Sequence, residues 1–129
     1  MKNALEARVS QLKVLRDDLK QVCDQRREKF IGFFNKVSER LPEIYRELTK
    51  CEVAATGGHA NLLILDKNET PFESQIIFDF CPPGKRHGVD IESLSGGEKT
   101  IAALSFVLAL AQVKQPPFVV MDEVDAFLD

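Results

Sequence analysis

Apolar residues recur every three or four positions along the first 29 residues of the chain, and this stretch contains neither glycine nor proline. With Val9 at position a of a heptad, eight of the twelve a and d positions from Lys2 to Arg40 are apolar, and the pattern holds best from Leu5 to Cys23. Such a repeat predicts a coiled-coil helix, although one amphipathic helix lying on a core would show a similar pattern. The partner strand of a coiled coil would have to come from outside this sequence.

The apolar face becomes broader directly after Glu28, where aromatic and aliphatic residues cluster. A face this wide suits a globular core better than a two-stranded seam. We therefore divide the chain into the end of a coiled-coil arm, residues 1–29, and a globular lobe, residues 30–129. The residues that carry this change are Phe30, Ile31, Phe33 and Phe34.

The middle of the chain predicts a helix end and a β-hairpin. Pro42 has no amide hydrogen to donate, so we expect a kink or a fresh helix start there, with a helix over Glu43–Lys50. The pair Gly57-Gly58 then breaks the helix. Two apolar runs, Asn61–Asp66 and Gln75–Cys81, flank a turn-rich connection, which indicates an antiparallel hairpin with a long loop.

The last third of the chain predicts one buried helix and one buried strand. Thr100–Val113 contains no charged residue, so we expect a helix that is buried on most sides. At ~1.5 Å per residue it reaches only about 21 Å, which is too short for a bilayer core of ~30 Å. Two prolines end this helix, and the apolar run Phe118–Met121 then predicts a fully buried strand.

The composition excludes several classes of protein. At 129 residues, the chain has room for one small domain and an appendage, and its glycine and proline contents are ordinary. Three cysteines without a C-x-x-C pair argue against a disulfide framework or a zinc ribbon and favour a reducing compartment. Two distant histidines do not make a histidine-based metal site, and no N-terminal apolar segment predicts export.

Charge is distributed unevenly along the chain. Residues 1–50 contain 12 Lys and Arg against 8 Asp and Glu, a net charge of +4, whereas residues 51–129 contain 5 against 12, a net charge of −7. The first part is thus a moderately basic rod and the second an acidic lobe. Because both signs are interleaved along the rod, a solvated helix face is favoured over nucleic-acid binding.

Two acidic residues follow the predicted strand. In nucleotide hydrolases, an apolar strand in the middle of a sheet presents carboxylates at the edge where the ligand binds. Asp122 is then suited to hold Mg²⁺ through water, and Glu123 to orient the water that attacks a γ-phosphate. A strand that merely ends in surface carboxylates would show the same sequence.

The segment Leu94-Ser95-Gly96-Gly97-Glu98-Lys99 directly precedes the uncharged helix. Ser95 is a good N-cap, and the two glycines allow close approach to the backbone. The amides of the first turn and the helix dipole then form an anion site. A plain capped turn is the alternative, but a glycine-bearing helix start, an uncharged helix, two prolines and a strand ending in Asp-Glu form a specific order.

These motifs resemble those of ABC-type ATPases: LSGGEK matches the ABC signature, and FVVMDE followed by VDAFLD matches Walker B and the D-loop. DEVDAFLD, with GGHANLLILD and PPGKR upstream, is similar to the SMC (structural maintenance of chromosomes) family, whereas transporters typically have proline at the position of Val124. Phe127 departs from the small residue usual in relatives. The resemblance covers nearly the whole chain and implies an α/β fold. This fold is the C-terminal lobe of an ABC-type head of the P-loop NTPase superfamily, preceded by an N-terminal coiled-coil helix.

The resemblance also implies a role for each motif residue. Asp122 would be the magnesium ligand, binding the metal through water, and Glu123 would be the catalytic base. The signature would contact the γ-phosphate of ATP held on the opposite head, so that hydrolysis needs two heads. Lys85 and Arg86 are weaker candidates for contact with DNA or the signature helix, and a solvated loop suits them equally. The residues assigned to ATP binding are Leu94, Ser95, Gly96, Gly97, Glu98, Lys99 and the D-loop residue Asp129.

By this resemblance, ATP and Mg²⁺ are the cofactors, and no membrane is involved. The implied partners are the N-terminal half of the same head with its coiled-coil strand, a second SMC head in a heterodimer, a kleisin subunit, and DNA without sequence preference. PPGKR and GGEKTIAAL resemble a cohesin subunit, while GGHANLLILD and Met121 lean toward a condensin subunit or prokaryotic SMC. The expected location is the chromosome, in the nucleus or in a prokaryotic nucleoid.

The implied activity is ATP hydrolysis that drives DNA tethering in cohesion or condensation. No G-x-x-x-x-G-K-[ST] phosphate loop occurs in the 129 residues, so we expect the chain alone to be inactive and the head to continue beyond Asp129. The alternatives are a coiled-coil ABC ATPase of double-strand-break repair, a transporter domain, and a non-enzymatic scaffold with a degenerate head.

Overall fold

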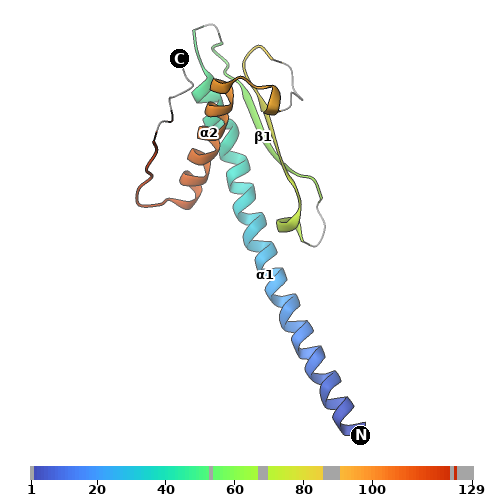
Figure 1. The fold of residues 1–129 in the computed structure, drawn as a ribbon. Helices are drawn as coiled ribbons and strands as arrows, with labels where there is room; N and C mark the ends of the chain where they lie inside the picture. The colour runs from blue at the N-terminus through green and yellow to red at the C-terminus, as the bar shows by residue number, and fades with distance from the viewer. Residues whose placement is uncertain (1, 53, 67–69, 86–90, 123, 125–129) are drawn as a thin grey trace.

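The computed structural model describes residues 2–52, 54–66, 70–85, 91–122 and 124, with side chains from residue 6 onward. Figure 1 shows that the N-terminal half of the first helix projects as a rod, whereas the hairpin and the second long helix lie beside its C-terminal half. In chain order the elements are α1 (Lys2–Thr49), β1 (His59–Ile64), η1 (Pro71–Glu73), β2 (Ile76–Cys81), η2 (Ile91–Ser93) and α2 (Gly96–Lys114).

α1 is one helix of 48 residues, and Pro42 lies inside it. The expectation of a fresh helix start at this proline is therefore wrong. Proline removes one backbone hydrogen bond, but Val37, Leu41 and Tyr45 are all buried and hold both flanks of the helix on the core. The helix also runs through residues 29 and 30, so the proposed boundary between arm and lobe coincides with no helix break and stays a prediction.

β1 and β2 form the predicted antiparallel hairpin, although β1 lies two residues earlier in the chain than expected. Ala60 pairs with Phe80, and Leu62 pairs with Phe78. Ala60, Leu62 and Phe80 are buried, while the alternate residues of β1 face outward. This period of two turns one face of the hairpin toward the core.

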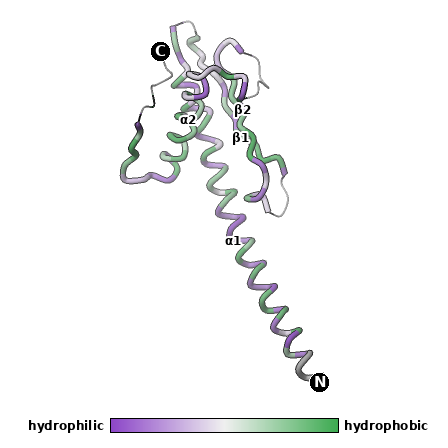
Figure 2. Tube along the Cα trace, viewed as in Figure 1, coloured by the Kyte–Doolittle hydropathy of each residue, from purple (hydrophilic) through white to green (hydrophobic). Residues whose placement is uncertain are grey.

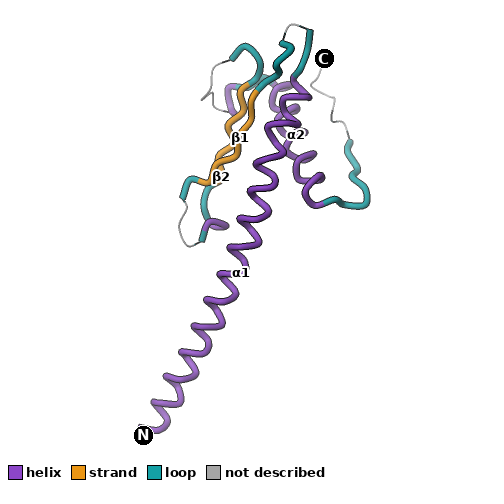
Figure 3. Tube along the Cα trace, turned by 180° about the vertical axis from the view of Figure 1, so that it is seen from behind, coloured by secondary structure: helices purple, strands orange, loops and turns teal. Residues whose placement is uncertain are grey.

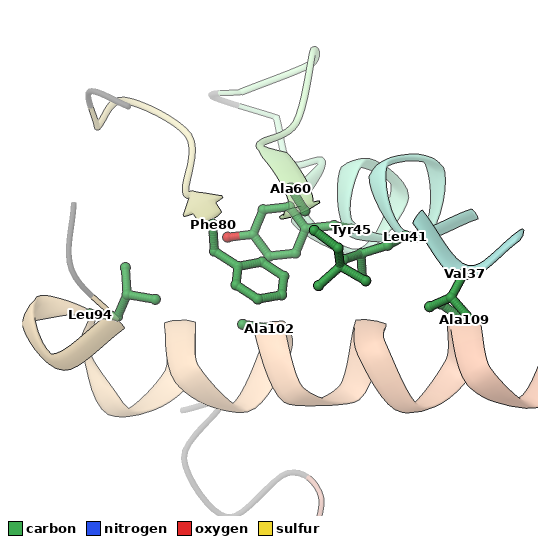
Figure 4. Close-up of a cluster of buried hydrophobic side chains, with 9 residues drawn as sticks. Val37, Leu41, Tyr45, Ala60, Phe80, Leu94, Ala102 and Ala109 are labelled. Atoms are coloured by element: carbon green, nitrogen blue, oxygen red, sulfur yellow. The ribbon is translucent and has the colours of Figure 1, made fainter. Parts of the chain in front are cut away.

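The core lies where α1, the hairpin and α2 meet, as Figure 4 shows. Tyr45 of α1 packs on Phe80 of β2 with ring centroids 5.1 Å apart. α2 contributes the small residues Ala102, Ser105 and Ala109, which allow α1 to approach closely. The Ser105 hydroxyl is satisfied inside this core because it donates to the Ala102 carbonyl at 2.7 Å.

α2 confirms the predicted helix but begins earlier, at Gly96, and buries only one face among the described residues. Ala102, Ser105 and Ala109 lie in the core, whereas Val107 is 42% exposed. The expectation of burial on most sides is therefore wrong for this structure, because α1 and the hairpin cover one side of the helix only. Within the described part of the chain, no helix has the combined length and apolar character needed to cross a membrane.

The segment Phe118–Met121 has no regular secondary structure, so the prediction of a fully buried strand is wrong for this structure. Val120 is 84% exposed, and Figure 2 shows a hydrophobic stretch in the chain that follows α2. A strand needs a neighbour for its backbone hydrogen bonds. Among the described residues the one sheet is the β1–β2 hairpin, which Figures 1 and 3 place on the opposite side of α2 from this segment.

Candidate functional site

Ser95 shapes the start of α2. It has an extended backbone (φ −64°, ψ 164°) and is the N-cap, so the predicted cap is confirmed, with Gly96 and Gly97 as the first helical residues. The Glu98 amide donates to Ser95 Oγ at 3.3 Å, and the Ser95 amide donates to Glu98 Oε2 at 2.7 Å. This reciprocal pair is a capping box, which satisfies backbone donors that a helix start would leave unpaired.

Glu98 also joins the helix start to the loop that follows β2. Lys85 Nζ donates to the same oxygen, Glu98 Oε2, at 2.7 Å, across 13 positions of the chain. The hydrogen bond from Lys85, followed by the one from the Ser95 amide, lowers the pKa of the Glu98 carboxyl below its usual value. Glu98 is therefore ionised at neutral pH and held from two sides.

Two further contacts fix the predicted signature segment on the rest of the lobe. Leu94 is buried in the core, and Lys99 Nζ donates to the Glu92 carbonyl in η2 at 3.0 Å. Leu94 and Lys99 thus hold the segment in place, whereas Ser95 and Gly96 remain exposed at the end of the helix.

The exposed end of α2 is chemically suited to an anion. The amides of the first turn point out of the helix at the positive end of its dipole, and the glycines place no side chain over them. Ser95 Oγ uses a lone pair for the Glu98 amide, which leaves the hydroxyl hydrogen for an anionic oxygen.

The predicted acidic site is only partly described. Asp122 is exposed, and within the described residues no hydrogen bond or ion pair joins it to the signature segment. Glu123, Asp129 and Arg86 lie outside the described residues. The part of the chain that the structure describes contains no group of three potential metal ligands. One accessible carboxylate nevertheless fits the share of a Mg²⁺ site assigned to Asp122, because Mg²⁺ takes few protein ligands and keeps several waters.

The pairing of Lys85 with Glu98 is the contact that sequence reasoning did not specify. A glutamate three residues after a serine is the sequence signal of a capping box, so the bond between Ser95 and Glu98 was accessible from the sequence. The sequence allows Lys85 to contact DNA, the signature helix or solvent. In the structure its side chain binds Glu98 in the signature helix, α2. No pattern in the sequence connects Lys85 with Glu98, which lie 13 positions apart.

Residues 18–129 match the family described as RecF/RecN/SMC N terminal domain. The chain is 44% identical over 127 residues to structural maintenance of chromosomes protein 1 of Saccharomyces cerevisiae, which covers 96% of the chain and 10% of that protein. It is 35% identical over 111 residues to the chromosome partition protein Smc of Methanocaldococcus jannaschii, covering 86% of the chain and 9% of that protein. The chain thus spans about a tenth of the length of these relatives.

Two solved structures are also similar to the chain. One is an Smc head domain with an extended coiled coil, bound to the C-terminal domain of ScpA, from Pyrococcus furiosus. Its TM-score is 0.73 at 33% identity, over 88% of this chain and 26% of that one. The other belongs to work on ATP-driven dimerization and DNA stimulated activation of SMC ATPases. Its TM-score is 0.65 at 34% identity, over 79% of this chain and 56% of that one.

Proposed function

Because this chain belongs to the SMC family and shares the fold of SMC head domains, we propose that it forms the C-terminal side of an ABC-type ATPase head at the end of a coiled-coil arm. The observation that carries the proposal is the start of α2, where a capping box leaves Ser95 and Gly96 exposed at the N-terminal end of the helix. This is an arrangement that binds phosphate.

In this proposal, Ser95, Gly96 and Gly97 bind the γ-phosphate of an ATP that is held on a second head. The Ser95 hydroxyl and the amides of Gly96 and Gly97 donate to the phosphate oxygens, so hydrolysis requires two engaged heads. Asp129 would lie at the junction between them. The dimerizing SMC ATPases among the similar structures support a two-headed site.

Asp122 and Glu123 act on the ATP bound to their own head. Asp122 would hold Mg²⁺ through water, and the ion would supply positive charge to the phosphate oxygens. Glu123 accepts a proton from the water that attacks the γ-phosphate. The exposure of Asp122 supports its access to such a ligand.

The remaining partners follow from uncovered surfaces and from the relatives. The N-terminal half of the head would supply the phosphate loop and a second coiled-coil strand, and it would cover Phe118–Met121 and the outer face of α2. The head bound to ScpA supports a kleisin partner, and the similar structure from work on DNA stimulated activation supports DNA as a partner. We expect this DNA binding to have no sequence preference. The similarity to structural maintenance of chromosomes protein 1 (44% identity) and protein 4 (40% identity) supports a cohesin- or condensin-type subunit. Such a subunit would tether DNA on the chromosome, in the nucleus or nucleoid.

Replacing Glu123 by glutamine in the full-length protein, assayed with its partner head, tests this function. ATP-dependent head engagement should persist, while turnover should fall by about a hundredfold or more because the general base is lost. The exposed Glu52 offers a matched control, since Glu52→Gln removes one carboxylate outside the motifs assigned to the site and should leave turnover unchanged. Full turnover in Glu123→Gln would exclude this residue as the base, and absence of turnover in the unaltered protein would favour the scaffold alternative.

A further inference from the structure

One ion pair of the described residues joins two separate elements. The pairs Arg40–Glu43 and Lys50–Glu47 each link residues three positions apart, whereas Lys85 and Glu98 connect the loop after β2 to the first turn of α2. The side chains of Lys85 and Glu98 are 39% and 24% exposed, so water screens this pair and its contribution to stability is small. Its position at the start of α2 therefore calls for a role other than stability.

The backbone of Lys85 is held on the end of the hairpin. Its amide donates to the Pro82 carbonyl at 3.2 Å, and its carbonyl accepts from Cys81 Sγ at 3.2 Å. Cys81 is the last residue of β2, and both Cys81 and Pro82 are buried. The Lys85 side chain therefore extends from a fixed point of the lobe.

The charge of Glu98 is unfavourable for the proposed phosphate site. Its carboxylate lies in the first turn of α2, where it orients the Ser95 amide, and an unpaired negative charge there would repel a γ-phosphate. Lys85 donates to the very oxygen that accepts the Ser95 amide. One ammonium group can thus hold the carboxylate in place and offset its charge.

We propose that Lys85 is a positioning residue of the γ-phosphate site: it acts through Glu98, holding Ser95 in its capping geometry and neutralising the carboxylate next to the incoming phosphate. This inference rests on the function proposed above for Ser95. Lys85 itself does not contact ATP in this arrangement, so its loss should weaken ATP-dependent engagement without removing the chemical step.

The test measures head engagement and turnover against ATP concentration in the full-length protein with its partner head. Lys85→Met should raise the KM for ATP, and the ATP concentration for half-maximal engagement, by about three- to tenfold with kcat nearly unchanged. Lys85→Arg should stay within about twofold of the original values because the charge is kept. Lys50→Met is the matched control, since it removes an exposed ion pair of 2.6 Å between Glu47 of α1 and Lys50, the residue directly after this helix, and should change neither quantity.

A double variant separates this electrostatic role from a structural one. Adding Glu98→Gln to Lys85→Met should recover most of the lost affinity, because an amide oxygen still accepts the Ser95 N–H without repelling phosphate. An unchanged KM in Lys85→Met, a further loss in the double variant, or a large drop in the thermal midpoint of Lys85→Met would each overturn the proposal.

Gly97→Leu, in the same assay, tests the underlying function independently. A bulky side chain in the first turn should block the phosphate and abolish engagement, while leaving a helix that is intrinsically more stable. Normal engagement in Gly97→Leu would refute the function proposed for the signature segment. If Gly97→Leu blocks engagement and Lys85→Met has no effect, only the role of Lys85 is refuted.

Discussion

The two halves of α1 carry apolar residues at the same heptad positions, but their surroundings are opposite. Val9 and Val37 both occupy position a, yet Val9 is 58% exposed and Val37 is 2% exposed. The helix between them is unbroken. α2 and the hairpin cover the C-terminal half, whereas no described residue covers the N-terminal half. A heptad pattern thus indicates that a face is to be covered, without indicating by which element.

The change between the two halves occurs near Arg26, a d position that holds a charged residue. The Arg26 guanidinium carbon lies 4.0 Å from the centre of the Phe72 ring, and Phe72 packs edge-on against Phe30 with centroids 6.5 Å apart. Phe72 belongs to η1 in the hairpin connection, so this connection covers the helix where the rod meets the lobe. An aromatic face opposite Arg26 explains how a cation fits at a seam position.

The largest effect on the free energy of unfolding is expected when a buried side chain in the covered half of α1 is shortened. Leu41→Ala should lower the free energy of unfolding by about 2–5 kcal/mol, because Leu41 is fully buried and its loss leaves a cavity. Leu12→Ala is the matched substitution in the uncovered half and should change it by less than about 0.5 kcal/mol. Denaturant unfolding of the 129-residue chain measures both. Equal costs would show that the N-terminal half is covered in solution, and their dependence on protein concentration would identify self-association.

A smaller loss of stability should appear at high pH, where the only tyrosine of the chain, Tyr45, ionises. Burial, with added repulsion from Glu98 and Cys81, raises the pKa of Tyr45 to about 12. Unfolded tyrosine ionises near pH ~10, so the stability gained from the buried phenol is fully present below that pH and is lost as pH rises toward 12. The ultraviolet absorbance of tyrosinate follows this group alone.

The expected midpoint of the tyrosine titration is about pH 12 in the native chain and about pH 10 in denaturant. Leu12→Ala should leave the native midpoint unchanged, because Leu12 lies on the uncovered half of the helix. A native midpoint near the ordinary value would show that the C-terminal half of α1 is not packed around Tyr45, and the contrast between the two halves would then fail.

Sequence reasoning succeeded where neighbours along the chain decide the structure. The predicted N-cap, Ser95, is confirmed, and Glu98 three residues later completes a capping box that residue types alone would have indicated. The hairpin was likewise predictable, because two apolar runs flank a turn-rich connection. The capping box closes within three residues, and the hairpin joins two runs that follow one another along the chain.

Sequence reasoning failed where contacts between distant parts of the chain decide the structure. A fresh helix start was one of the two outcomes expected at Pro42, but the burial of Leu41 and Tyr45 on its two sides outweighs one lost hydrogen bond. Phe118–Met121 has the composition of a buried strand, yet a strand forms only beside another strand, and the described residues provide none there. The roles of Asp122 and Glu123 stay predictions for the same reason, since they depend on a sheet edge that the described part of the chain does not contain.

The smallest expected change in the free energy of unfolding tests where along α1 the covered half begins. Arg26→Met keeps an apolar stem but removes the cation over Phe72, so it should lower the free energy of unfolding by about 0.5–1 kcal/mol. Arg27→Met removes a neighbouring exposed cation and should stay within about 0.5 kcal/mol of the unaltered chain. A double-mutant cycle of Arg26→Met with Phe72→Leu, followed by denaturant unfolding, isolates the contact from other effects of each substitution.

A coupling of about 0.5–1 kcal/mol between the two sites would place the end of the uncovered half at Arg26. Without coupling, Arg26 would be an ordinary solvated cation on the rod, and η1 would not hold α1 at this position. The transition from exposed to buried positions would then lie farther along the helix, where Phe34 and Val37 enter the core. A second coiled-coil strand could in that case follow α1 past Phe30, so the cycle also measures how far along α1 such a strand can pair.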